Sequence, residues 1–359
     1  MRKVHSKLFT PGPTEVRPEV LQAMAVPQVH HRSPEFSELY ARLQPKLQRF
    51  LYTENPVLLF TSSSTGAMEA AVQNCVSKKC LNLVNGAFSR RWHEITVACG
   101  LPCEVLENPW DQAIKPEQVR EKLATGAFDA VTLAFNETST GMMNPLEEIA
   151  HVCREFPDVL LLVDAVSAMG GVKIEVDRLG LDVCLAGGQK AVAMPAGLTI
   201  CSVSERALAR AEELKPHTYY FSFPVMMKYH KKDQTPSTPS ISHMYALDVQ
   251  LDAVLNEEGL ERRFARHEEM ASLVQTWARR HFDMYPEGGY WSKTLTCVKN
   301  TRGISVKDLN NNLVEKYGMR ISNGYGDLKE QTFRIAHMGD ITVPEVRGLL
   351  STIDGILGL

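Results

Sequence analysis

From Pro34 to Ala211, short apolar runs alternate with longer amphipathic ones. Seven of the short runs have the length of buried strands, and most lack the apolar–polar alternation of a half-exposed strand. The predicted strands are Leu58–Thr61, Leu81–Asn85, Glu104–Leu106, Ala130–Phe135, Leu160–Asp164, Val183–Ala186 and Leu198–Ser202. The helical patterns between them are Ala67–Ser77, Arg90–Cys99, Pro116–Leu123 and Leu146–Glu155. Because such strands need cover on both faces, the pattern predicts an open parallel α/β sheet.

The pattern changes in the last part of the chain. Residues 219–242 contain Phe223-Pro224 and a Thr/Pro/Ser-rich run, and we expect a long ordered loop there. The elements expected after it are helices at Met244–Glu257, Leu260–His281, Val306–Tyr317 and Val343–Ile356, and strands near Thr294–Val298 and Thr332–Ile335. We predict a large domain over residues 1–255 and a small α+β domain over 256–359. The N-terminal segment is expected to pack on the small domain or on a dimer partner.

Composition and charge exclude several classes of protein. The 359 residues carry a net charge of -3 and 44% hydrophobic residues, which argues against nucleic-acid binding and against disorder. The longest apolar runs are far shorter than the about 20 residues of a membrane span. Thr10-Pro11-Gly12-Pro13 stands where a signal peptide would have its apolar region. The 8 cysteines lack disulfide or zinc-site spacing, so we expect reduced thiols, no metal and a cytoplasmic protein.

Two strand ends carry opposite charges. Asp164 ends one apolar strand, and Lys190 follows the next strand and Gly187-Gly188. Taken alone, such an aspartate is more often a turn or capping residue, and most lysines are surface residues. Ligands of open α/β sheets, however, bind beyond the carboxyl ends of the strands. A desolvated lysine can form a Schiff base, and enzymes that use pyridoxal phosphate need such a lysine and an aspartate at the pyridinium nitrogen.

Three further features fit the same ligand, and each has a simpler alternative. The hydroxyl-rich run from Thr61 to Thr65 opens a helix, where backbone N–H groups could hold a phosphate, but it could also be an ordinary N-cap. Phe88 follows a strand and could stack on a planar cofactor or belong to the core. Arg334 lies in an apolar strand and could bind a carboxylate or form a structural ion pair.

Together with other segments, these features resemble the class V aminotransferases of the fold-type I pyridoxal phosphate superfamily. The branch that the chain resembles most contains the alanine–glyoxylate, serine–glyoxylate and serine–pyruvate aminotransferases. The matching segments, in chain order, are Thr10–Thr14, His31–Phe36, Ser63–Ala70, Asn136–Gly141, Val163–Ser167, Gly188–Lys190, Thr238-Pro239 and Phe333–Ile335. The resemblance implies a mostly parallel seven-stranded central sheet flanked by helices, with a smaller C-terminal α+β domain.

The resemblance also implies a role for individual residues. Lys190 is expected to form the Schiff base with pyridoxal 5′-phosphate and to carry the proton, while Asp164 keeps the ring nitrogen protonated. Arg334 is expected to bind the α-carboxylate of the substrate. Further cofactor contacts are expected from Ser63, Ser64, Thr65 and Gln189 at the phosphate, Phe88 and Val166 on the two ring faces, and Thr138 at the ring hydroxyl. Thr238 would reach the phosphate of the neighbouring subunit, so the active sites would be shared in a homodimer.

The implied reaction is a ping-pong transamination between alanine or serine and glyoxylate or pyruvate. Thr235 stands where the alanine–glyoxylate enzymes have Tyr, and Ser64 and Thr65 stand where they have Gly and His, so the substrate pair stays open. A 2-aminoethylphosphonate–pyruvate transaminase is one alternative, and a non-catalytic scaffold or complex subunit is another. A cysteine desulfurase is disfavoured because the one late cysteine, Cys297, lies in a strand pattern rather than in a loop.

Overall fold

The computed structural model describes residues 5–359 and contains a seven-stranded sheet with the order β2-β10-β9-β8-β5-β3-β4. Strand β10 runs antiparallel to both β2 and β9, and the other pairs in this sheet are parallel. The strands are β2 (Val57–Phe60), β3 (Cys80–Val84), β4 (Cys103–Glu107), β5 (Ala130–Ala134), β8 (Leu160–Asp164), β9 (Val183–Gly187) and β10 (Thr199–Val203). All seven predicted strands are present, and the prediction of a mostly parallel sheet is confirmed.

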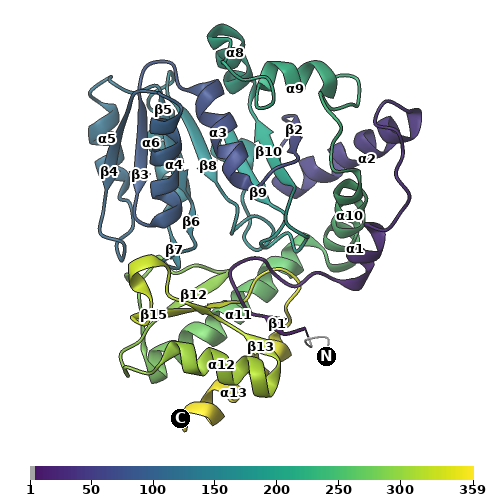
Figure 1. Ribbon diagram of the computed structural model, residues 1–359. Coiled ribbons are helices and arrows are strands. Elements are labelled where there is room, and N and C mark those ends of the chain that lie inside the picture. The colour runs from purple at the N-terminus through teal and green to yellow at the C-terminus, as the bar shows by residue number, and fades with distance from the viewer. Residues whose placement is uncertain (1–4) are drawn as a thin grey trace.

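Helices cover both faces of this sheet (Figure 1). They are α1 (Pro18–Ala23), α2 (Pro34–Leu51), α3 (Ser64–Cys75), α4 (Ala87–Ala98), α5 (Pro116–Leu123), α6 (Leu146–Arg154), α7 (Val176–Leu179), α8 (Glu205–Leu214), α9 (Phe223–His230) and α10 (Ile241–Asp252). A short hairpin, β6 (Asn136–Glu137) and β7 (Met142–Met143), follows β5.

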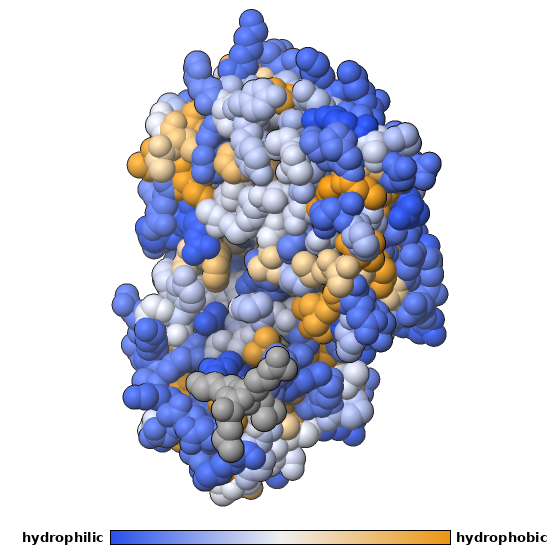
Figure 2. Space-filling view, turned by 45° about the vertical axis from the view of Figure 1, so that its right-hand side comes forward, coloured by the Kyte–Doolittle hydropathy of each residue, from blue (hydrophilic) through white to orange (hydrophobic). Residues whose placement is uncertain are grey.

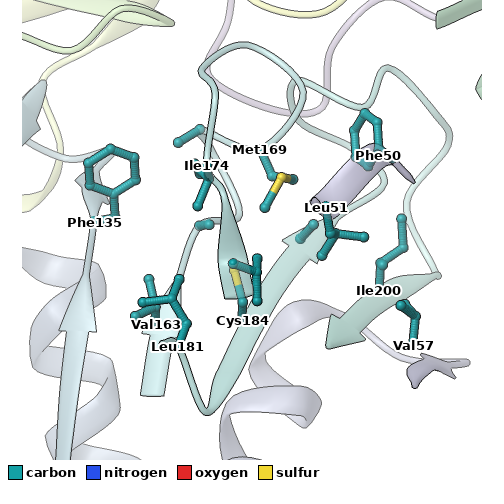
Figure 3. Close-up of a cluster of buried hydrophobic side chains, with 14 of the residues drawn as sticks. Phe50, Leu51, Val57, Phe135, Val163, Met169, Ile174, Leu181, Cys184 and Ile200 are labelled. Atoms are coloured by element: carbon teal, nitrogen blue, oxygen red, sulfur yellow. The ribbon is translucent and has the colours of Figure 1, made fainter. Parts of the chain in front are cut away.

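Alternate residues of each strand enter different cores. In β8, Leu161 and Val163 pack in one cluster, whereas Leu160 and Leu162 pack in the other. The first cluster lies under α2, and Figure 3 shows part of it, with Val163 beside Leu181 and Phe50 on the far side of the cluster. The second cluster lies under α3, α4, α8 and α9. Burial on both faces explains why the strand sequences are apolar throughout.

The C-terminal region has its own four-stranded antiparallel sheet, with the order β11-β12-β15-β14. Its elements are α11 (Leu260–His281), β11 (Asp283–Met284), β12 (Leu295–Lys299), α12 (Val306–Tyr317), β13 (Met319–Arg320), β14 (Ser322–Asn323), η2 (Gly326–Leu328), β15 (Thr332–Ala336) and α13 (Val343–Leu357). The N-terminal strand β1 (Lys7–Leu8) pairs in parallel with β13, so the start of the described chain joins this region. The π-helical segment η1 (Ala253–Glu258) contains the predicted boundary after residue 255, which stays a prediction.

One predicted loop is wrong in part, because residues 219–242 contain helix α9. Ser222 caps this helix, accepting a hydrogen bond from the Val225 N–H at 3.4 Å. Pro224 lies in the first turn, where a helix needs no N–H from it. The side chains of Phe223 and Met226 are buried against the second core, so the proline-containing sequence still has an apolar face to pack.

The face shown in Figure 2 is mostly hydrophilic, with small hydrophobic groups between the polar ones. No helix within residues 5–359 is both long and apolar enough to span a bilayer. The same residues contain no cluster of three or more His, Cys, Asp or Glu side chains placed to hold a metal ion. All eight cysteines are present as free thiols.

Candidate active site

A cavity of about 280 Å³ lies at the carboxyl ends of β8 and β9. Its walls come from the starts of α3 and α4, from the β6–β7 hairpin, and from the residues that follow β8 and β9. The lining residues are Ser63, Ser64, Thr65, Met68, Phe88, Arg91, Thr138, Asp164, Val166, Gln189 and Lys190. Nine of these eleven are residues for which the sequence predicts a cofactor contact. The volume is near the lower end of the range for small-molecule sites, about 300–1,000 Å³.

Asp164 is a buried acid at the edge of the cavity. It is the last residue of β8, and its Oδ1 accepts a hydrogen bond from the Val166 N–H at 2.8 Å. Within residues 5–359 it forms no ion pair. Burial raises the pKa of Asp164 to about 6, although the charges of Lys190 and Arg91 act in the opposite direction. A positively charged ligand atom would therefore stabilise the ionised carboxylate.

Lys190 is held at the same cavity by the N-terminal segment. Its Nζ donates to the Pro11 carbonyl, and its own carbonyl accepts from Thr14 Oγ1 at 3.0 Å. A Cβ added at Gly12, where φ is +107°, would lie 2.8 Å from Nζ, so glycine makes room for the amine. Burial lowers the pKa of Lys190 to about 8, although the charge of Asp164 opposes the shift. The lysine is therefore not the solvated surface residue that the simpler alternative predicted.

The hydroxyl-rich run forms one wall of the cavity. Ser63 is the N-cap residue of α3 by its backbone, but its side chain makes no capping hydrogen bond. Ser64 and Thr65 follow in the first turn. Gly187, at the end of β9, allows the close approach of this wall, because an added Cβ would lie 2.7 Å from Ser64 Oγ and 2.9 Å from Val166 Cγ1. The start of α3 thus presents backbone N–H groups and hydroxyls to an anion.

Phe88 faces the cavity and belongs to none of the buried core clusters. The centroid of its ring lies 5.7 Å from Lys190 Nζ, 4.9 Å from the guanidinium carbon of Arg91 and 5.4 Å from the ring centroid of Tyr325. The alternative that Phe88 is a core residue is therefore wrong. Thr138 lines the same cavity, and its hydroxyl donates a hydrogen bond to the Ser167 hydroxyl.

Arg334 reaches the site from β15 of the C-terminal region. Its Nη1 donates to the Thr138 carbonyl at 3.1 Å, and its Nε and Nη2 both lie 3.2 Å from the Asn323 carbonyl. Within residues 5–359 it pairs with no carboxylate, so the alternative of a structural ion pair is wrong. The guanidinium is close enough to Lys190 for its charge to contribute to lowering the lysine pKa.

Thr238 is not among the residues that line the cavity of its own chain. It is exposed, in the segment that precedes α10. The neighbouring Thr235 is buried, and its hydroxyl donates to the Ser237 carbonyl at 2.8 Å. Arg32 holds this segment by donating to the Thr235 carbonyl at 2.6 Å. A contact between Thr238 and the phosphate of a neighbouring subunit stays a prediction.

Comparison with known proteins identifies the family. The family model for aminotransferase class-V matches residues 8–324. The chain belongs to the class V aminotransferases. An uncharacterized aminotransferase of Methanocaldococcus jannaschii is 37% identical over 98% of this chain and 92% of its own length. A serine–glyoxylate aminotransferase of Methylorubrum extorquens is 30% identical over 98% and 90%. The crystal structure of an alanine–glyoxylate aminotransferase from Nostoc sp. superposes with a TM-score of 0.93 at 29% identity, covering 99% and 96%.

The family and the fold-type I architecture imply pyridoxal 5′-phosphate, and the residues of this class V aminotransferase fit that group. The cavity offers a buried carboxylate for a protonated ring nitrogen and an amine for an aldehyde. It also offers hydroxyls and a helix N-terminus for a phosphate. The space left by Gly187 is next to these hydroxyls, where a side chain would obstruct the phosphate. The donor set therefore matches the three polar parts of the cofactor.

Sequence reasoning missed one buried acid of this class V aminotransferase. Glu137 of β6 is fully buried, and its carboxylate accepts hydrogen bonds from the N–H groups of Phe88 and Ser89 and from both hydroxyls of Ser89 and Ser139. An added Cβ at Gly86 would lie 2.3 Å from the Glu137 side chain, which explains the glycine. Glu137 thus fixes the start of α4 and the orientation of the cavity wall. The Asn-Glu-Thr-Ser-Thr-Gly segment contained this residue, but nothing in the segment distinguishes it from a surface acid.

Proposed function

We propose that the protein catalyses ping-pong transamination between a small L-amino acid, alanine or serine, and a small 2-oxo acid, glyoxylate or pyruvate. The main support is that Lys190, whose pKa is lowered to about 8, and the buried Asp164 line the same cavity. The relatives whose names specify serine–glyoxylate and alanine–glyoxylate aminotransferases support the choice of substrates.

Lys190 is proposed as the group that moves the proton. Pyridoxal phosphate, when bound, supplies an aldehyde for the amine and an electron sink for the carbanion. When the amino acid occupies the site and Nζ of Lys190 is free, Lys190 would accept the Cα proton as general base and later return a proton as general acid. A lysine with a pKa near 8 can be neutral, and therefore basic, over part of the physiological range.

The other residues bind and orient. Asp164 holds a proton on the ring nitrogen through a charge-assisted hydrogen bond, and burial strengthens that interaction. Arg334 binds the substrate α-carboxylate, which fixes the Cα–H bond relative to Lys190. Phe88 and Val166 both line the cavity and would hold the two faces of the ring. Ser63, Ser64, Thr65 and Gln189 hold the phosphate, and Thr138 approaches the ring hydroxyl.

We propose a homodimer with shared active sites. Thr238 is exposed, and it does not line the cavity of its own chain. The proposal predicts that Thr238→Ala weakens cofactor binding without changing the residues of the same chain's cavity. Mixing Thr238→Ala subunits with Lys190→Ala subunits should restore part of the activity, because one site of each mixed dimer would have both residues.

The test uses purified protein incubated with pyridoxal phosphate. Transamination is assayed with alanine, serine, glycine and 2-aminoethylphosphonate as donors and with glyoxylate and pyruvate as acceptors. Borohydride should remove the yellow colour and attach the cofactor to the peptide that contains Lys190, as mass spectrometry would show. Lys190→Ala should abolish both results, whereas Lys232→Ala, at an exposed lysine, should change neither. Turnover that survives in Lys190→Ala, or a protein that never takes up the cofactor, would refute the proposal.

A further inference from the structure

One cation of the cavity has no role in the reaction proposed above. Arg91 lies one helical turn after Phe88 in α4 and lines the cavity. Within residues 5–359 its side chain forms no hydrogen bond or ion pair, and its guanidinium carbon lies 4.9 Å from the centroid of the Phe88 ring. A guanidinium carries five N–H donors and is not deprotonated in proteins. The site therefore keeps a permanent positive charge whose donors are free.

The adjacent arginine shows that α4 has acidic partners within reach. Arg90 pairs with Glu107 of β4 on the outside of the sheet. Arg91 points to the cavity instead and remains without a carboxylate. The two residues are thus a matched pair, one neutralised by the protein and the other facing the ligand site.

The residues already discussed bind the polar groups of the cofactor and of a small neutral amino acid. Asp164 serves the ring nitrogen, the start of α3 serves the phosphate, and Arg334 serves the α-carboxylate. None of these assignments uses Arg91. Arg91 is therefore available to bind an additional anionic group on the substrate.

The positions of the two arginines suit a substrate with two anionic ends. The rings of Phe88 and Tyr325 lie 5.4 Å apart, with Arg91 over the first and Arg334 5.5 Å from the second. Lys190 Nζ lies 5.7 Å from the Phe88 ring, so the amine is close to the same aromatic pair. One guanidinium is therefore associated with each ring, and both guanidinium charges act on the reacting lysine.

We propose that Arg91 binds the side-chain carboxylate of a dicarboxylic substrate, so that amino acids and oxo acids of the aspartate class are used in addition to alanine or serine. This inference rests on the proposed aminotransferase function and specifies its substrate class. Arg91 determines specificity by contacting the substrate, whereas Lys190 and Asp164 perform the chemistry on either class.

The first experiment measures binding without turnover. Isothermal titration calorimetry of the cofactor-loaded protein compares succinate with propionate, which lacks the second carboxylate. Since a charge-assisted hydrogen bond contributes strongly, we expect succinate to bind at least about tenfold more tightly than propionate. Arg91→Gln should remove this preference and Arg90→Gln should retain it. Equal binding of the two acids to the wild type, or a preference that survives in Arg91→Gln, would overturn the proposal.

The second experiment measures specificity in turnover. The ratio of kcat/KM for aspartate to that for alanine should fall about tenfold to a hundredfold in Arg91→Gln and stay unchanged in Arg90→Gln. Equal losses for both donors, or a weaker affinity for the cofactor with an unchanged ratio, would assign Arg91 to the ring or the phosphate and overturn the inference. If the wild type uses alanine but not aspartate, the inference fails and the proposed function stands. If no donor is used, the proposed function fails.

Discussion

Two clusters of charged side chains meet at consecutive residues of the chain. Lys190 belongs to the cavity cluster, and the carbonyl of Ala191 binds Arg263, the centre of the second cluster. Arg263 of α11 is 1% exposed, and its Nη2 donates to the Ala191 carbonyl at 2.8 Å. Its Nη1 lies 2.8 Å from both Glu258 Oε2 and Asp340 Oδ1. Every charge in this cluster therefore has an opposite charge or a carbonyl beside it within the same chain.

The cavity cluster has no such internal compensation. Among residues 5–359, Asp164 pairs with no cation and Arg91 pairs with no anion, and Lys190 donates to a neutral carbonyl. Burial without a charged partner destabilises an ion, so the folded chain retains Asp164 and Lys190 at a cost in free energy. The comparison indicates that the compensated cluster contributes to stability, whereas the uncompensated one is completed by a ligand. Variants at the two clusters should therefore have opposite effects.

The largest effect is expected at Lys190. Lys190→Met keeps most of the aliphatic stem and removes the amine, so turnover should fall by at least about 10⁴-fold. Because burial lowers the lysine pKa to about 8, the folded cofactor-free protein should become more stable at pH 7, by up to about 3 kcal/mol. Steady-state kinetics and urea unfolding measure the two changes. A variant that lost activity because it had lost stability would contradict the comparison.

Removing a charge from the cluster around Arg263 should instead lower the free energy of unfolding. Arg263→Met leaves two carboxylates with fewer partners, and its expected cost is about 3–5 kcal/mol of unfolding free energy. Arg91→Met is the matched variant in the cavity, and its expected stability change is within about 0.5 kcal/mol. Urea unfolding of the two cofactor-free variants measures the difference. Similar losses in both would mean that the clusters are not distinct in their contribution to stability.

Most of the fold could be predicted from the sequence, because burial on both faces leaves a clear signal in each strand. The helices Pro116–Leu123, Leu260–His281 and Val306–Tyr317 have the predicted bounds, since buried residues recur at helical spacing along each of them. Helix α9 was missed because proline and serine indicate turns wherever they occur, and their tolerance in a first helical turn depends on what the helix packs against.

The site could be predicted only where a residue type is tied to the chemistry. Asp164 ends one strand and Lys190 follows the next, and pyridoxal phosphate enzymes need an aspartate and a lysine. Glu137 and Arg91 were missed because a glutamate in a hairpin and an arginine in a helix are indistinguishable from solvated charges until the fold places them. The hydrogen bond from Lys190 to the carbonyl of Pro11 involves a backbone atom 179 positions away, which no residue type identifies.

A smaller effect is expected from Asp164→Asn, and it depends on pH. Burial raises the Asp164 pKa from 3.8 to about 6, so the unfolded chain releases this proton at a lower pH than the folded chain does. Between these two values the wild type should lose up to about 3 kcal/mol of stability relative to Asp164→Asn as pH rises, and the difference should then stay constant. Urea unfolding of both cofactor-free proteins from pH 4 to pH 7 tests this. Parallel curves would show that the carboxylate is not penalised by burial.

The smallest effect is expected at Gly187, where the cavity wall has room only for a glycine. In Gly187→Ala the new Cβ would meet Ser64 Oγ at 2.7 Å, Val166 Cγ1 at 2.9 Å and Gln189 Oε1 at 3.2 Å. Relieving these contacts should displace the phosphate-facing wall at a cost of about 1–2 kcal/mol in stability. Titration with pyridoxal phosphate should show weaker binding than in the wild type. Gly348→Ala is the control, because its added Cβ meets nothing within 4 Å and replaces a glycine in helix α13, so stability should rise slightly. If Gly187→Ala bound the cofactor as tightly as the wild type, the close approach of β9 to the start of α3 would serve packing alone.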